Sequence, residues 1–185
     1  MKHVELITDG ACIGNPGQGG WACILRFGAT KKELFGYDPR TTNNRMEMMA
    51  AIQGLLALRE PCEVRVTTDS EYLRQGITVW VAFWKRRHWW KKNRPVRNVD
   101  LWMELDALAA VHKTEWVWTK GHAGHPDNER ADLLAENAAL TQTSSFGSGI
   151  PHGPLRLALG WEYVPPRPQI GLFEDQPEDE GDDPG

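Results

Sequence analysis

The 185-residue sequence has no apolar run near the roughly 18 residues that a membrane-spanning helix requires. Its three cysteines are an odd number without metal-like spacing, so we expect reduced thiols in the core or in loops. The N-terminus passes directly into an apolar strand, so no signal peptide is expected. These absences predict a cytoplasmic globular protein that does not contact a membrane.

Charge of one sign is missing from two segments. No base follows Phe173, whereas seven acids do, and no acid lies between Trp80 and Val99, whereas seven bases do. The formal net charge of −4 therefore hides a basic body and an acidic tail. After Thr141 the composition changes to Ser, Gly, Pro and acid, so we expect a folded domain at 1–140 and a largely disordered tail at 141–185.

The hydrophobic pattern predicts a mixed α/β sheet. Three strands read as an antiparallel meander, and a helix capped at Thr42 or Asn43 then leads to a fourth strand that favours a parallel crossover. Later segments alternate between helix and strand. The expected strands are 3–12, 20–27, 31–38, 64–68 and 114–118, and the expected helices are 43–58, 71–90, 100–112 and 126–140, with a basic loop at 91–98. Asp100 is expected to cap the helix that runs to about His112.

Four acids stand among apolar residues, where an ionised carboxylate is costly unless it is paired or binds a cation. Asp9 lies within the first strand, Asp69 ends the fourth strand, and Glu47 and Asp132 lie in the first and last helices. Each also has an ordinary explanation: Asp9 in a turn, Glu47 on a solvated helix face, Asp69 as an N-cap, and Asp132 as a surface acid.

Adjacent first and fourth strands would bring Asp9 and Asp69 together, and helices packed on the sheet would add the other two acids. Such a cluster repels itself unless hard divalent cations neutralise it, and Mg²⁺ prefers oxygen ligands. Two ions at one site activate a water and stabilise the leaving oxygen in phosphodiester displacement.

Six motifs in order make the chain resemble bacterial type 1 ribonuclease H over about residues 3–140. The motifs are TDGACIGNPG at 8–17, TTNNRMEMMAA at 41–51, TTDS at 67–70, RQGIT at 74–78, VRNVDLW at 96–102 and KGHAGHPDNERAD at 120–132. The resemblance implies a five-stranded mixed sheet, with strands 1–3 antiparallel, strands 4 and 5 parallel to strand 1, and helices on both faces.

The resemblance also implies an activity and a set of residues. The family hydrolyses the RNA strand of RNA–DNA hybrids with two Mg²⁺ ions, or Mn²⁺, and leaves 5′-phosphate and 3′-hydroxyl ends. It places the metal ligands at Asp9, Glu47, Asp69 and Asp132, with Asp9 bridging both ions, and a mobile proton-transfer histidine at His122 rather than His125. The hybrid contacts that it implies are Cys12, Asn15, Thr42, Asn43 and Asn44.

The segment around 80–98 interleaves tryptophans with bases, a composition suited to phosphates and sugars. The family has a basic protrusion here, which implies DNA-strand contacts at Trp80, Lys85, Arg86, Arg87, Trp89, Lys91 and Lys92. One or both of Trp80 and Trp84 are expected to be partly core, and Trp102, Trp116 and Trp118 are expected in the core. The chain departs from the family at Glu71, where glutamine is frequent, and activity should persist.

The tail contains one apolar island, Gln169 to Phe173, between Pro168 and the acids. It resembles the short peptide that docks on bacterial sliding clamps, with Gln169, Leu172 and Phe173 as the partner-binding residues. Folding back onto the domain is the alternative, and the acids could also cover the basic protrusion.

Two other functions share this sheet. A non-catalytic nucleic-acid-binding module would have no reason to keep all four acids, and a DNA-cutting transposase relative would not need the Asn43-Asn44 pair. We therefore expect a monomeric metal-dependent endoribonuclease.

Overall fold

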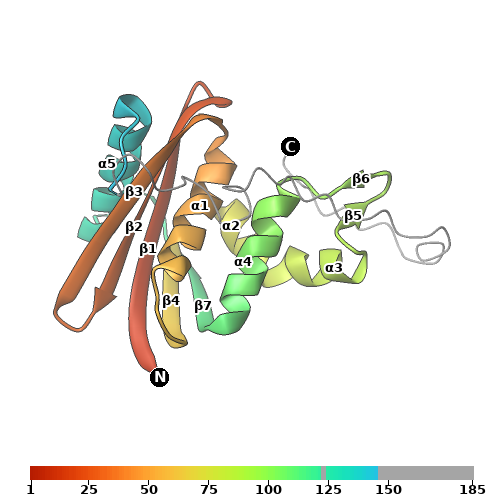
Figure 1. Cartoon of the computed structure of the whole chain (residues 1–185), viewed down its shortest axis with the longest axis horizontal. Helices are drawn as coiled ribbons and strands as arrows, with labels where there is room; N and C mark the ends of the chain where they lie inside the picture. Colours follow the sequence, from red (N-terminus) through yellow and green to blue (C-terminus); the bar gives the residue numbers. More distant parts are fainter. Residues whose placement is uncertain (122–123, 146–185) are drawn as a thin grey trace.

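A computed structural model describes residues 1–121 and 124–145 of the chain. Its centre is a five-stranded sheet in the order β3-β2-β1-β4-β7 (Figure 1). The strands are β1 (Lys2–Ile13), β2 (Gly17–Phe27), β3 (Thr30–Thr41), β4 (Cys62–Thr68) and β7 (Lys113–Trp118). The helices that flank the sheet are α1 (Asn43–Leu56), α2 (Glu71–Gln75), α4 (Val99–Val111) and α5 (Pro126–Thr141).

The strand directions are those expected from the sequence. β1 pairs antiparallel with β2 and parallel with β4, and β4 pairs parallel with β7. Thr8 of β1 lies opposite Thr68 of β4, so Asp9, within β1, and Asp69, just past the end of β4, stand at the same level of the sheet. The mixed-sheet prediction is confirmed, including the adjacency of the first and fourth strands.

The helices cover the two faces of the sheet unequally. In Figure 1, α5 lies on one side of the sheet and α1, α2 and α4 lie on the other. The main hydrophobic core lies on the α1 and α4 side, with Trp21, Trp102 and Ile52 among its fully buried members. Under α5 the buried clusters are smaller and use Ala131 and Ala135, which lets this helix lie close to the strands.

Two glycines set the distance between the sheet and the helices that carry acids. A Cβ at Gly10 would lie 2.4 Å from the backbone N of Glu47, at the start of α1. A Cβ at Gly20 would lie 2.1 Å from the backbone O of Ala135 in α5. No larger residue fits at either position without moving a helix away from the sheet. The chain thus brings α1 and α5 against β1 and β2 at backbone contact distance.

The expected single helix over 71–90 is wrong. After α2 the chain forms a π-helical turn, η1 (Gly76–Trp80), then α3 (Val81–Arg86), and a two-stranded hairpin of β5 (Trp90–Lys91) and β6 (Arg94–Pro95). Figure 1 shows α3 and the hairpin extending away from the sheet. We call residues 80–98 the basic arm. The basic loop expected at 91–98 is therefore partly an ordered hairpin.

The start of α4 also differs from the prediction that Asp100 caps it. The residue before the helix is Asn98, in a left-handed conformation, and Asp100 lies inside the first turn. Its carboxylate accepts two hydrogen bonds from Arg45 of α1, at 3.0 and 2.8 Å. The carboxylate thus ties α1 to α4 instead of capping the backbone.

The tryptophans divide between the core and the surface. Trp102 is fully buried and Trp84 is buried, as expected, and Trp116 is partly buried against the core. Trp80 is also partly buried, with its ring centroid 5.8 Å from that of Trp84. The prediction for Trp118 is wrong, because its side chain is 42% exposed at the end of β7.

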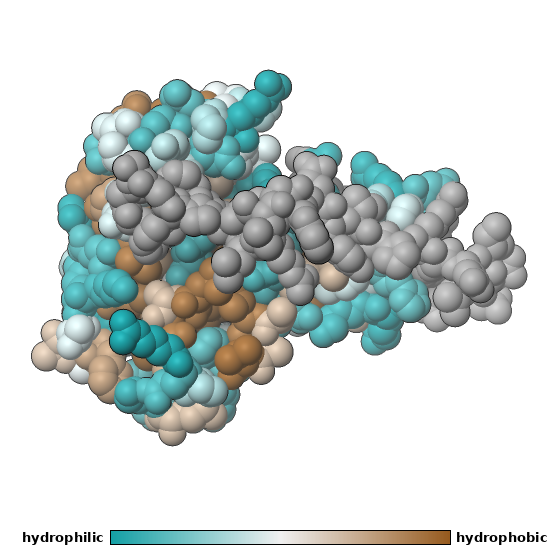
Figure 2. Space-filling view, in the orientation of Figure 1, coloured by the Kyte–Doolittle hydropathy of each residue, from teal (hydrophilic) through white to brown (hydrophobic). Residues whose placement is uncertain are grey.

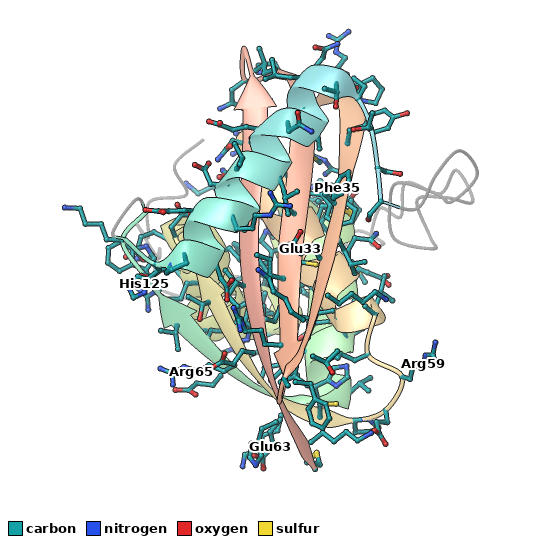
Figure 3. All side chains as sticks on the ribbon, turned by 90° about the vertical axis from the view of Figure 1, so that its left-hand side faces the viewer. Glu33, Phe35, Arg59, Glu63, Arg65 and His125 are labelled. Carbon is teal, nitrogen blue, oxygen red and sulfur yellow. The ribbon has the colours of Figure 1, made fainter. Side chains whose placement is uncertain are left out.

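The described chain ends against the edge strand β3. Ser145 donates its backbone N–H to the Phe35 carbonyl at 2.9 Å, and its hydroxyl accepts the Phe35 N–H at 3.0 Å. Figure 3 labels Phe35 on this strand, beside α5. The tail was predicted to span 141–185. Its residues 146–185, with the clamp-binding residues Gln169, Leu172 and Phe173, lie outside the described residues.

None of the helices within the described ranges is long and apolar enough to cross a bilayer. All three cysteines, Cys12, Cys23 and Cys62, are free thiols, as expected from their number and spacing.

Candidate active site

Two of the four acids come together because their strands are neighbours. Asp9 follows Thr8 in β1, and Asp69 follows Thr68, where β4 ends and turns toward α2. Ser70, not Asp69, caps α2 and accepts the Leu73 N–H at 3.1 Å. The capping explanation for Asp69 is therefore wrong, and Asp69 instead lines a pocket beside the end of β4.

Glu47 lies near Asp9 and Asp69 and comes from α1, on the face of the sheet opposite α5. Its helix begins at Thr42, which caps it by accepting the Arg45 N–H. The side chain of Glu47 is only 4% exposed, so the solvated-face explanation is wrong. Its Oε2 is buried and has no hydrogen-bond partner among the described residues. A buried carboxylate oxygen without a partner is costly, so this position requires a ligand or a proton.

One carboxylate oxygen from each of Asp9, Glu47 and Asp69 lies within 4.8 Å of the others. Asp9 itself is only 8% exposed, and its Oδ1 accepts the Gly10 N–H at 2.7 Å. Three acids from two strands and one helix thus share one small volume, as predicted from the sequence.

Asp132 borders the same pocket from α5. The pocket is lined by Thr8, Asp9, Asp69, Gly121, Asn128, Glu129 and Asp132. Asn128 and Glu129 were not expected from the sequence. They precede Asp132 by four and three residues, the spacing that puts side chains on one helix face, so helical periodicity from Asp132 would have found them.

The electrostatics of the pocket follow from its like charges. Burial, together with Asp69 and Asp132, raises the pKa of Asp9 to about 8. Burial, together with Asp9 and Asp69, also raises the pKa of Glu47 well above its ordinary range. Glu136, one turn beyond Asp132 on α5, contributes to the raised pKa of Asp9. The cluster therefore holds protons unless positive charge is brought to it.

The donor set fits a divalent cation. All the converging groups are carboxylates, which are the hard oxygen ligands that Mg²⁺, Mn²⁺ and Ca²⁺ accept, and no thiol or imidazole lines the described pocket. The partnerless Oε2 of Glu47 and the raised pKa of Asp9 are both relieved when a cation binds. We conclude that the pocket is a divalent-metal site.

The residues implied as hybrid contacts lie around the start of α1. Asn15 accepts the Asn43 N–H through Oδ1 at 3.0 Å, and the Cys12 thiol lies 3.5 Å from the Thr41 carbonyl oxygen. Thr42 caps α1, which leaves the side chains of Asn43 and Asn44 outside the capping interaction. The loop after β1 and the start of α1 thus form one half-exposed polar surface.

The residues implied as DNA-strand contacts lie on the basic arm. Lys85, Arg86 and Lys92 are exposed, and Lys85 Nζ forms an ion pair with Asp106 at 2.8 Å. Arg87 stacks over the Phe83 ring at 4.2 Å, Lys91 is half-buried, and Trp89 packs partly against the core. Figure 2 shows that the described surface of the arm is mainly hydrophilic on the side viewed. DNA contact by these residues stays a prediction.

The predicted proton-transfer residue His122 lies outside the described residues. His125, which the sequence disfavoured for this role, is the exposed residue before α5 and makes no side-chain cap bond (Figure 3).

The site fits the class of metal-dependent phosphodiesterases, because acids from β1, the end of β4, α1 and α5 gather where divalent ions can be held. Comparison with known proteins is consistent with this class. The family model for RNase H matches residues 1–140. Ribonuclease H of Aeromonas salmonicida is 58% identical over 140 residues, which cover 75% of this chain and 91% of that protein. Ribonuclease H of Nitrosococcus oceani is 59% identical over 136 residues, covering 73% and 92%.

Solved structures give the same result. The chain is similar to LC9-RNase H1, described as a type 1 RNase H with the type 2 active-site motif, with a TM-score of 0.72, 27% identity, and coverage of 95% of this chain and 97% of that one. RNase H1 from Halobacterium salinarum has a TM-score of 0.57 at 26% identity, covering 76% and 99%. The chain belongs to the ribonuclease H family, and it is a nuclease.

Proposed function

We propose that the protein is an endoribonuclease that hydrolyses the RNA strand of RNA–DNA hybrids, using two Mg²⁺ ions held by Asp9, Glu47, Asp69 and Asp132. The observation that carries this proposal is the convergence of three carboxylate oxygens, from Asp9, Glu47 and Asp69, within 4.8 Å beside the end of β4. Mn²⁺ satisfies the same oxygen donors and should substitute for Mg²⁺.

The carboxylates have distinct places in the proposed site. Asp9 is central, because it is buried between the other acids, and it is the residue suited to contact both ions. Glu47 approaches from α1, whereas Asp69 and Asp132 border the open pocket. When bound, the ions supply an activated water and stabilisation of the leaving oxygen. His122 would transfer a proton near that oxygen, since imidazole titrates close to neutral pH.

Recognition of RNA would come from the surface beside the acids. The 2′-hydroxyl distinguishes RNA from DNA and is accessible in a shallow minor groove. Asn15, Asn43, Asn44 and Cys12 offer short polar groups there, with Thr42 near a phosphate. The basic arm would follow the DNA strand by neutralising phosphates without reading sequence.

The test uses one end-labelled strand at a time in an RNA–DNA hybrid, double-stranded RNA and double-stranded DNA, each with and without Mg²⁺. We expect cleavage of the RNA strand of the hybrid alone, only with Mg²⁺, giving 3′-hydroxyl products that a polymerase can extend. Binding of the hybrid without cleavage would support the non-catalytic alternative, and cleavage of duplex DNA would contradict the proposal.

We also propose that the enzyme is a cytoplasmic monomer that a bacterial sliding clamp recruits through Gln169, Leu172 and Phe173. The three free cysteines suit a reducing compartment, and two apolar anchors after a glutamine suit a peptide groove. Replacing Leu172 and Phe173 by Ala should abolish clamp binding in a pull-down with purified clamp and leave hybrid cleavage unchanged. Equal clamp binding by both proteins would contradict this role.

A further inference from the structure

The end of β7 contacts the backbone of Asp69 through a side-chain hydrogen bond. The Trp118 indole N–H donates to the Asp69 carbonyl at 2.9 Å. This carbonyl lies just past the last paired residues of the two strands, Thr68 and Trp118, where the backbone ladder ends. A side-chain donor from β7 therefore continues the pairing by one peptide beyond the sheet.

The peptide between Asp69 and Ser70 is held at both of its polar groups. Its C=O accepts from the Trp118 indole, and its N–H donates to the Thr68 hydroxyl at 3.1 Å. The preceding carbonyl, that of Thr68, accepts the Thr119 N–H at 2.9 Å. With both ends of this peptide bonded, the backbone torsion after Asp69 is restricted, and the direction of the Asp69 Cα–Cβ bond is restricted with it.

The segment that follows β7 approaches Asp69 a second time. Gly121, three residues after Trp118, lies so close that a Cβ there would be 2.6 Å from Asp69 Oδ2. The exit of β7 thus touches both the carbonyl and the carboxylate of one acid.

We propose that Trp118 is a positioning residue that aims the Asp69 carboxylate at the metal site by holding the Asp69 carbonyl. This role rests on the proposed function of the site. It accounts for a large aromatic side chain that is exposed at a strand end, where the sequence pattern predicted core packing. In this role the indole ring contributes its single N–H donor and holds that donor in a fixed position.

The chain offers a matched control on the same strand. Trp116 also uses its indole N–H, which donates to the Thr114 hydroxyl at 3.1 Å within β7. Trp118→Phe and Trp116→Phe each keep an aromatic ring and remove one indole donor. Only the first change releases the backbone of an acid in the site.

The experiment is a calorimetric titration of Mg²⁺ into the full-length protein without nucleic acid. We expect Trp118→Phe to weaken Mg²⁺ binding about fivefold, the effect of losing one hydrogen bond, and Trp116→Phe to leave it within about twofold. Amide hydrogen exchange at Ser70 should become faster in Trp118→Phe alone. In turnover assays the Mg²⁺ concentration for half-maximal rate should rise about fivefold, with KM for the hybrid unchanged.

Three results would overturn the role of Trp118: unchanged Mg²⁺ binding, equal weakening in both variants, or a raised KM for the hybrid with normal Mg²⁺ binding. The last would make Trp118 a substrate contact. Failure of the wild-type protein to bind Mg²⁺ would instead refute the proposed function itself, so the two failures are distinguishable.

Discussion

Two groups of carboxylates on this protein have opposite electrostatic environments. At the pocket, Asp9 and Glu47 face other acids, and their pKa values are raised. On the surface where α5 crosses β2 and β3, hydrogen bonds from Arg26 and Arg130 lower the pKa values of Asp127 and Glu33 respectively. Figure 3 shows Glu33 on β3 behind α5. The paired acids stabilise the fold through their ion pairs, whereas the ionised forms of Asp9 and Glu47 are unfavourable until a cation binds.

The paired group is a small network rather than isolated contacts. Asp127 accepts from the Arg26 guanidinium and forms an ion pair with Lys31 at 3.1 Å. Lys31 also pairs with Glu33, and Arg130 binds Glu33 through two nitrogens. The network fastens α5 to the β2–β3 hairpin. It therefore keeps in place the helix that carries Asp132.

The largest expected effect comes from removing the charge of an acid at the pocket, and the same change in the paired group serves as the control. Asp9→Asn should lower kcat at least about a hundredfold, because a central metal ligand is lost. Asp127→Asn, the same chemical change in the paired group, should leave kcat within about threefold. Steady-state cleavage of a labelled hybrid at saturating Mg²⁺ measures both, and turnover by Asp9→Asn near the wild-type rate would refute the metal-ligand role.

Metal should stabilise the unpaired group specifically. At a Mg²⁺ concentration of 100 times Kd, ligand linkage predicts a gain of about 2.7 kcal/mol in the free energy of unfolding. Urea denaturation with EDTA and with Mg²⁺ measures this gain. It should vanish in Asp9→Asn and persist in Asp127→Asn, whereas a gain that persists in both variants would place the stabilising ion elsewhere.

The two groups of carboxylates should change the stability of the fold in different pH ranges. Folded Asp9 keeps its proton up to a pKa of about 8, whereas unfolded Asp9 releases it near pH 4, so raising the pH between these values favours unfolding. Glu47 acts in the same direction. The metal-free protein should lose several kcal/mol of stability across this range, since each unit of pKa difference corresponds to about 1.4 kcal/mol.

The control for the pH effect is the variant without the carboxylate. Urea denaturation of Asp9→Asn in EDTA should show a smaller loss between pH 4 and pH 8, and identical slopes would contradict the raised pKa. The lowered pKa values of Glu33 and Asp127 act in the other direction, because their stabilising effect is lost only as the pH falls below about 4.

The smallest effect is expected from the surface ion pairs. Arg130→Ala removes the bidentate contact with Glu33, but water screens exposed pairs, so Tm should fall by only about 1–3 °C. Differential scanning calorimetry at low and high salt measures the change, which should shrink at high salt. A larger, salt-independent loss would show that the network does more than fasten α5.

The sequence predicted what depends on residue pattern and order. Strand alternation and the crossover helix gave the sheet, and the apolar surroundings of Asp9 and Glu47 marked them as acids that need a partner. The alternatives for Asp69 and Glu47 were resolved only by tertiary contacts: Ser70 took the cap, and burial excluded the solvated face. Asp132 was singled out by the same pattern of apolar neighbours, and the family resemblance then implied its role as a metal ligand.

The missed features are those that local patterns do not encode. Trp118 reads as a buried strand residue, but the edge strand β7 leaves its last ring exposed and gives its N–H to Asp69. The sequence around Asp100 predicts a helix cap, but the Asp100 carboxylate instead accepts a hydrogen bond from Arg45, 55 residues away. A helix over 71–90 follows from propensity, since a π turn has no sequence pattern distinct from that of an α-helix.

That π turn, η1, determines the direction of the basic arm. Successive residues of an α-helix are rotated by about 100° around its axis, and a π turn accommodates one residue more than an α turn. Deleting one residue from 76–80 would rotate α3 by that angle and carry Trp84 out of the core. The number of residues in η1 therefore sets the direction in which the basic arm leaves the domain. Deletion of a single codon there would turn the arm in another direction and leave its basic residues unchanged.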